Sequence, residues 1–108
     1  MNLEAAGIVS KARVNAKCKG RRREYTVRDI LRARGFDVVR AAGSLGPADL
    51  VALHPSLPTL MVQVKSRDWP HGTEALGLVA LAERYRGRAV VQAWRFIDGS
   101  TEPSLRTY

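Results

Sequence analysis

The stretch GPADLVALHPSLPTLMVQVKS, residues 46–66, constrains the fold most because it predicts a β-hairpin. Two apolar segments, residues 48–53 and 59–66, flank the proline-containing turn HPSLP. Asp49, Gln63 and Lys65 interrupt these segments. Burying a carboxylate or an ammonium is costly unless the charge is paired or binds a metal. The hairpin is therefore expected to contain a polar cluster that needs an explanation.

Side-chain alternation predicts where this cluster lies. Met61, Gln63 and Lys65 share one face of their strand, because successive side chains point to opposite faces. Symmetric closure of the hairpin sets Asp49 opposite Val64, within about one residue, so Asp49 neighbours Gln63 and Lys65. Two simpler interpretations remain open: an Asp49–Lys65 ion pair at a strand end, or two charges at solvent-wetted edges.

The rest of the pattern predicts one α/β domain over residues 1–108, in the order α-β-β-β-α-β. A small mixed central sheet is flanked by helices at residues 19–34 and from 73 to about 86, with further strands at 36–44 and 88–97. Residues 98–108 are expected to be a loop, and residues 1–17 a loose helix or a flexible basic arm. The second helix has a wide apolar arc, which indicates either deep burial or an oligomer surface.

Composition excludes several classes of protein. No apolar run approaches the roughly 18 residues of a membrane span, and the first residues lack the apolar core of a signal peptide. Cys18 is the only cysteine, so we expect no internal disulfide and no thiolate metal site. The expected location is a cytoplasm.

Charge indicates the class of partner. The net charge is +8, and residues 11–40 contain eleven basic and three acidic residues, which accounts for the whole excess. Arginine forks suit phosphate oxygens, and phosphate contacts dominate affinity for nucleic acids. A clustered excess therefore favours a nucleic-acid partner over a surface that only aids solubility.

Phosphodiester hydrolysis is the chemistry that would use such a polar cluster. A hard divalent cation such as Mg²⁺ prefers oxygen ligands, polarises a phosphate and acidifies a water molecule. Asp49, the Gln63 side-chain oxygen and the Val64 carbonyl are candidate ligands. Glu24, within KGRRREYTVR, either completes this set or only screens the basic residues around it. Lys65 is placed to stabilise developing charge or to position the water.

These residues resemble a known pattern. Gly46-Pro-Ala-Asp49 followed by Gln63-Val-Lys65 resembles the PD-(D/E)xK nuclease motif. With KG…E (residues 19–24), GFDVVRAAGS (35–44), ADLVAL (48–53), VQVKS (62–66) and WRFI (94–97), the chain resembles the archaeal and phage Holliday junction resolvases of the Hjc type. The resemblance covers roughly residues 17–98 and implies a restriction-endonuclease-like fold.

The resemblance implies a homodimeric endonuclease that cuts four-way DNA junctions with Mg²⁺ or Mn²⁺, in an archaeal, bacterial or phage-infected cell. By position, it implies active-site roles for Glu24, Asp49 and Lys65, and places Ser44 near the scissile phosphate. Arginine and lysine positions that match DNA contacts are Lys19, Arg21, Arg22, Arg23 and Arg40. Arg67, just after the motif, is either a DNA-phosphate contact or a local partner of Asp68.

Gln63 departs from the pattern, because most members of the superfamily have Glu or Asp there. The amide oxygen still coordinates a cation but carries no charge. Two alternatives remain: another nuclease activity on branched or duplex DNA, and a DNA-binding module without catalysis. Trp69 is interpreted either as a DNA-stacking side chain or as a loop anchor.

Overall fold

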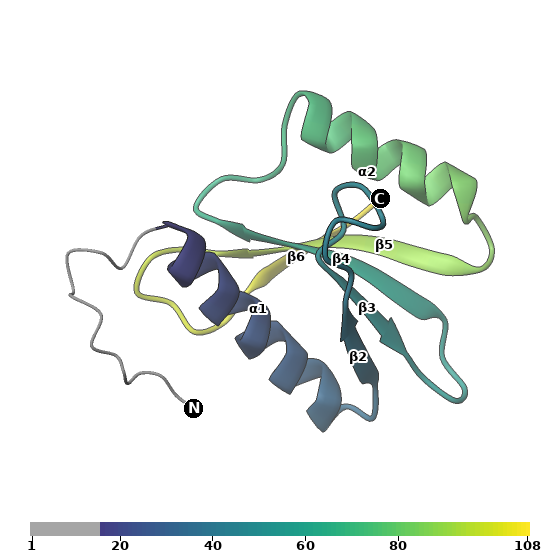
Figure 1. Cartoon of the computed structure of the whole chain (residues 1–108), viewed down its shortest axis with the longest axis horizontal. Helices are drawn as coiled ribbons and strands as arrows, with labels where there is room; N and C mark the ends of the chain where they lie inside the picture. The colour runs from purple at the N-terminus through teal and green to yellow at the C-terminus, as the bar shows by residue number, and fades with distance from the viewer. Residues whose placement is uncertain (1–15) are drawn as a thin grey trace.

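Two helices and five strands account for the regular structure of residues 16–108, the part of the chain that this computed structural model describes (Figure 1). In chain order the elements are α1 (Ala16–Ala33), β2 (Asp37–Arg40), β3 (Leu50–Leu53), β4 (Thr59–Ser66), α2 (Thr73–Arg84), β5 (Ala89–Phe96) and β6 (Ser104–Thr107). The predicted α/β fold class is confirmed, with one strand more than predicted. Residues 1–15, most of the predicted arm, lie outside the described residues.

The strands form a mixed sheet in the order β2-β3-β4-β5-β6. β2, β3 and β4 pair antiparallel, whereas β4 and β5 are parallel because α2 returns the chain across the sheet. β6 pairs antiparallel with β5. Helices α1 and α2 cover opposite faces of this sheet (Figure 1). The result is three layers, with a separate apolar core under each helix.

Strand β4 contributes alternate residues to the two cores. Leu60, Val62 and Val64 belong to the core on the α1 side. Met61 belongs to the core on the α2 side, where Leu78 of α2 is fully buried. The predicted division of this strand into two faces is confirmed. Gln63 and Lys65 therefore lie on the face that α2 covers.

The hairpin register differs slightly from its symmetric expectation. Leu50 pairs with Val62, so the same register carried back by one residue brings Asp49 opposite Gln63. This is one residue from the predicted partner Val64 and within the tolerance of that prediction. Asp49 is hydrogen-bonded to Val62 and Val64, the residues on either side of Gln63.

Two predicted elements are wrong in extent. The strand predicted over residues 36–44 ends at Arg40, because Ala42 and Gly43 have φ angles of 52° and 84°, which an extended strand does not allow. A turn covers residues 42–47 instead. The tail predicted as a loop contains β6, whose four residues are all exposed. Exposure on both faces removes the apolar alternation by which a strand is predicted.

Helix α2 presents an apolar side to solvent. Leu76 is 69% exposed and Val79 is 47% exposed, although Leu78 between them is fully buried. One side of the wide apolar arc is therefore buried against the sheet, and the other side is exposed. Within residues 16–108, neither helix combines the length and the apolar character needed to cross a bilayer.

Leu78 is expected to anchor α2 to the sheet. Leu78→Ala should lower the free energy of unfolding by about 2–5 kcal/mol, because it removes a fully buried side chain and leaves a cavity. Leu57→Ala, in the turn between β3 and β4 and 51% exposed, should change it by less than about 0.5 kcal/mol. Urea unfolding followed by tryptophan fluorescence measures both. Equal effects of the two substitutions would contradict this packing.

Candidate active site

Asp49 joins the two strands of the hairpin through its side chain. Its Oδ2 accepts a hydrogen bond from the Val64 N–H at 2.8 Å. Its own N–H donates to the Val62 carbonyl at 2.8 Å. The Asp49 carboxylate therefore lies directly against the Gln63–Val64 peptide of β4, at the N-terminal end of β3.

The environment of Asp49 disfavours its charge. Burial raises the pKa of the Asp49 carboxyl, and the negative charges of Glu24 and Glu74 raise it further. The hydrogen bond from Val64 and the positive charge of Arg40 lower that pKa but do not cancel the rise. Carboxylates from α1 and α2 thus act on the same half-buried acid, which is the arrangement that a bound cation would relieve.

Glu24 approaches the site from α1. Its side chain is only 15% exposed, and its Oε1 accepts a hydrogen bond from Arg40 Nε at 3.0 Å. This bond and the charge of Glu24 raise the pKa of Arg40. Arg40 is at the end of β2, beside Leu50 of β3. Glu24 therefore pairs with one specific base next to Asp49.

Gln63 and Lys65 meet a residue that the sequence analysis did not assign to the site. Glu74, in the first turn of α2, accepts a hydrogen bond from Lys65 Nζ at 2.8 Å through Oε1. Its Oε2 accepts one from Gln63 Nε2 at 3.3 Å. The only sequence signal was an acid in the first turn of the helix that follows the motif. Lys65 thus pairs with Glu74, and the interpretation as a plain Asp49–Lys65 ion pair is wrong.

Ser44 lies in the exposed turn after β2. With Leu45, Gly46 and Pro47 it lines one side of a cavity of about 350 Å³, and α2 lines the other side. Gly77 of α2 allows this close approach, because an added Cβ would lie 3.3 Å from the Pro47 ring.

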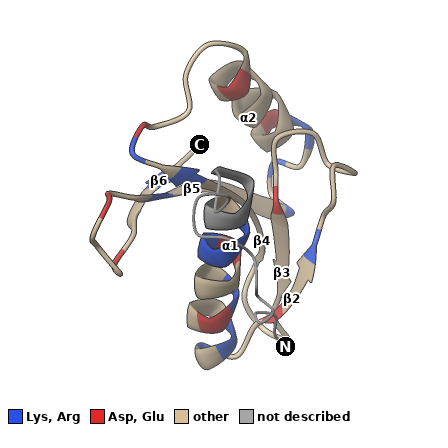
Figure 2. Cartoon of the chain, turned by 60° about the vertical axis from the view of Figure 1, so that its left-hand side comes forward, with Lys and Arg blue, Asp and Glu red and all other residues tan. Residues whose placement is uncertain are grey.

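The basic residues divide into exposed and engaged groups. In the cartoon of Figure 2, several positions of α1 are coloured as Lys or Arg. Arg21 and Arg22 are exposed on this helix. Lys19 belongs to the same helix, but its side chain is outside the described structure. Arg23 is 14% exposed, contacts Asp98 at 3.4 Å and lies over the Phe96 ring. It therefore also has a structural role.

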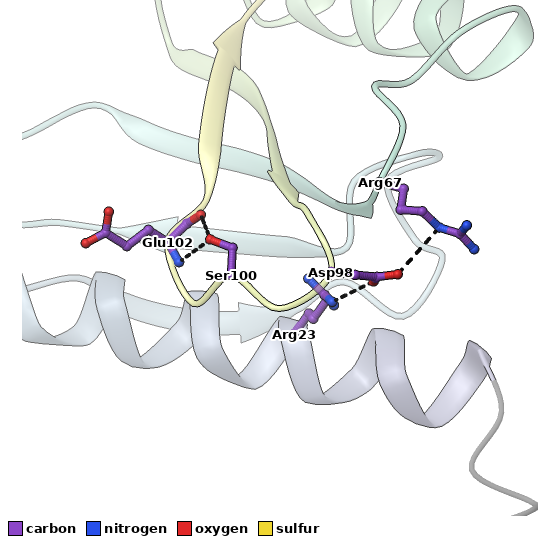
Figure 3. Close-up of polar contacts among 5 residues, drawn as sticks. All are labelled: Arg23, Arg67, Asp98, Ser100 and Glu102. Carbon is purple, nitrogen blue, oxygen red and sulfur yellow. Dashed lines mark hydrogen bonds and ion pairs between the residues drawn. The ribbon is translucent and has the colours of Figure 1, made fainter.

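Asp98 links Arg23 of α1 to Arg67, which follows β4 (Figure 3). The Arg67–Asp98 distance is 3.9 Å, and the Arg67 side chain is largely exposed. The ion-pair partner of Arg67 is thus Asp98 rather than the adjacent Asp68. Its exposure leaves it accessible to a DNA phosphate.

Trp69 lies between two guanidinium groups. The ring centroid is 4.5 Å from Arg95 Cζ and 4.3 Å from Arg106 Cζ, and the indole packs on the α2-side core. Cation–π contacts of this kind hold an aromatic ring in place. The arrangement favours a loop anchor over a side chain that is free to stack on DNA.

The residues fit a hard divalent cation. No group of three or more His, Cys, Asp or Glu side chains within residues 16–108 is already arranged around a metal position. Glu24 and Glu74 instead bind Arg40 and Lys65. Gln63 Oε1, however, is buried without a hydrogen-bond partner, beside a carboxylate whose charge is disfavoured. An orphaned oxygen among oxygen donors suits a cation such as Mg²⁺ or Mn²⁺.

Comparison with known proteins identifies the family. The family model described as "Archaeal holliday junction resolvase (hjc)" matches residues 15–100. The chain belongs to the archaeal Holliday junction resolvase family. The match includes all five predicted active-site positions, and Glu74 as well; the five are Glu24, Ser44, Asp49, Gln63 and Lys65. No curated protein matches the chain.

A solved resolvase shares the fold. The structure of Hjc, a Holliday junction resolvase from the archaeal hyperthermophile Archaeoglobus fulgidus, matches with a TM-score of 0.62. The match covers 83% of this chain and 71% of that chain, at 24% sequence identity. This likeness shows that the two chains share a fold.

Asp49→Asn should stabilise the cation-free protein at neutral pH. Asparagine keeps an oxygen that accepts the Val64 hydrogen bond but lacks the charge that burial disfavours. Because the folded-state pKa is raised, wild-type stability falls as pH rises through it. The advantage of the variant should therefore be largest near pH 7 and vanish below the ordinary pKa of Asp.

Urea unfolding in EDTA, from pH 7 to below the ordinary pKa of Asp, measures the difference in stability between wild type and Asp49→Asn. Asp68→Asn, which removes an exposed acid just after β4, is the control and should change little. A variant at Asp49 that is less stable than wild type at pH 7 would contradict the account.

Proposed function

We propose that this resolvase-family chain is a metal-dependent endonuclease that cuts four-way DNA junctions by symmetric phosphodiester hydrolysis. The observation that carries the proposal is the environment of Asp49 at the end of the hairpin. A half-buried carboxylate, an amide with an orphaned oxygen and a lysine lie together there, within the matched family region. This combination suits a phosphate and a cation better than it suits a stable apolar core.

The proposed cation is Mg²⁺, with Mn²⁺ as a substitute, held by Glu24, Asp49, the Gln63 side-chain oxygen and the Val64 carbonyl. When bound, such a cation polarises the phosphate and acidifies a water molecule. The hydrogen bond from Val64 orients the Asp49 carboxylate for this role. Arg40 holds Glu24 in the same region.

Lys65 is proposed to stabilise the negative charge that develops on the phosphate. Its side chain is 22% exposed, so it is partly shielded from water yet accessible to a substrate. The bond to Glu74 restricts its position on the α2-covered face of β4. Restricting a long, flexible side chain before the substrate arrives reduces the entropy lost in the reaction.

DNA binding is proposed to use the exposed arginines of α1, with Arg40, Arg67 and the turn that contains Ser44. Phosphate contacts of this kind fix position on DNA without reading its sequence. Selection of a junction would then depend on the shape of the DNA. Activity on chromosomal or phage DNA agrees with the cytoplasmic location expected from the sequence.

A homodimer is proposed because symmetric cutting needs two sites related by a twofold axis. Leu76 and Val79 form an exposed apolar side of α2 that a second copy would cover. Light scattering should give twice the chain mass of 11.9 kDa, and a monomeric mass at micromolar concentration would contradict this part of the proposal.

Cleavage of labelled DNA tests the proposed activity. With Mg²⁺, the wild type should cut a four-way junction at paired, symmetric positions, and at least about 100-fold faster than a linear duplex with the same arms. Asp49→Asn should reduce cutting at least about 100-fold while keeping junction affinity within about threefold, because it removes a proposed cation ligand. Asp68→Asn should cut normally.

Equal cleavage rates on junction and duplex would contradict junction resolution and indicate a more general nuclease activity. Binding without any product at every Mg²⁺ and Mn²⁺ concentration would replace it by a DNA-binding module.

A further inference from the structure

Glu74 bridges the two polar residues that β4 places under α2. Its Oε1 is 2.8 Å from Lys65 Nζ, and its Oε2 is 3.3 Å from Gln63 Nε2. Lys65 and Gln63 are two residues apart on one strand and so point to the same face. A single carboxylate from another element therefore spans the second half of the nuclease motif.

Gln63 has an unmet requirement in the same place. The residue is only 6% exposed, its nitrogen donates to Glu74, and its oxygen is buried with no partner. Exchanging the amide oxygen and nitrogen would set that oxygen against the Glu74 carboxylate, which is repulsive, so Glu74 fixes the orientation. Buried carbonyl oxygens without a donor are rare in native proteins. A cation is one partner that satisfies this oxygen.

The charge of Glu74 also reaches Asp49. Both Glu74 and Glu24 raise the pKa of the Asp49 carboxyl, after burial itself. The Asp49 carboxylate contacts the peptide that follows Gln63. Negative charge from α1 and α2 thus acts on the Asp49 carboxylate, which lies beside the Gln63–Val64 peptide.

We infer that Glu74 supplies the cation-binding carboxylate that the hairpin lacks at Gln63, so that Asp49, Gln63 Oε1 and Glu74 act together as ligands. The inference rests on the proposed metal-dependent function. A carboxylate accepts several contacts at once. Glu74 Oε1 therefore keeps its hydrogen bond with Lys65, while Glu74 Oε2 gives up its hydrogen bond with the Gln63 amide nitrogen and binds the cation instead. The charge absent from position 63 is then restored from α2.

Binding of Mn²⁺ in the absence of DNA tests this inference, by electron paramagnetic resonance of the free ion. Glu74→Gln should weaken Mn²⁺ binding at least tenfold, because it removes a charged ligand and keeps the size of the side chain. Glu83→Gln is the matched control: Glu83 is exposed, on the same helix, and paired with Arg86. It should change affinity less than twofold. Equal Mn²⁺ affinity of wild type and Glu74→Gln would overturn the inference.

A second background separates direct ligation from a general effect of charge or folding. In Gln63→Glu protein, whose hairpin carries its own acid, the loss caused by Glu74→Gln should shrink to about twofold. The same tenfold loss in both backgrounds would overturn the inference, because Glu74 would then act independently of position 63. Thermal unfolding in EDTA verifies that wild type and every variant in the experiment are folded.

Failure of this inference is distinguishable from failure of the proposed function. Wild type that cuts junctions while Glu74→Gln binds Mn²⁺ normally would refute the ligand role and keep the activity. Wild type that binds Mn²⁺ through Glu74 but cuts no junction would do the reverse.

Discussion

The Asp49 carboxylate is the constraint around which this site is organised. Its Oδ2, rather than a main-chain carbonyl, accepts the hydrogen bond from the Val64 N–H at 2.8 Å. The carboxylate cannot turn away from the hairpin without breaking that bond. It is also half-buried near two other carboxylates, which disfavours its charge. Arg40 and Lys65 offset this negative charge by binding the neighbouring acids rather than Asp49 itself. Such an arrangement costs stability in the absence of a cation and is typical of a site kept for function.

The topology explains how acids from three elements reach one place. Strands β4 and β5 are parallel, so the chain must cross over between them, and α2 forms that crossover. Six residues separate the end of β4 from the start of α2, which brings the first turn of the helix beside Lys65. Helix α1 lies on the opposite face (Figure 1) and contributes Glu24 at the edge where β2 and β3 meet. Each of the three layers therefore contributes one acidic residue: Glu24 from α1, Asp49 from the sheet and Glu74 from α2.

Local patterns in the sequence were sufficient for the hairpin but not for the contact made by Glu74. Period-two alternation correctly assigned Gln63 to one face, because that rule depends only on neighbouring residues. The Lys65–Glu74 contact depends on the path of residues 67–72, where Arg67 and Gly72 have φ angles of 67° and 60°. No periodic pattern predicts such a path. The family and the fold are established, whereas the catalytic roles of the acidic residues and of Lys65 are proposals.

Anomalous diffraction from a crystal containing Mn²⁺ would test the central claim most directly. The account predicts a single strong peak per chain that lies within about 2.5 Å of oxygens from Asp49, Gln63 and Glu74. Glu24 and the Val64 carbonyl are the other proposed ligands of this cation. Lys65 should remain close to Glu74 in that crystal. A Mn²⁺ peak bound elsewhere, with Asp49 still held only by Val64 and Gln63 Oε1 still unpaired, would contradict the account.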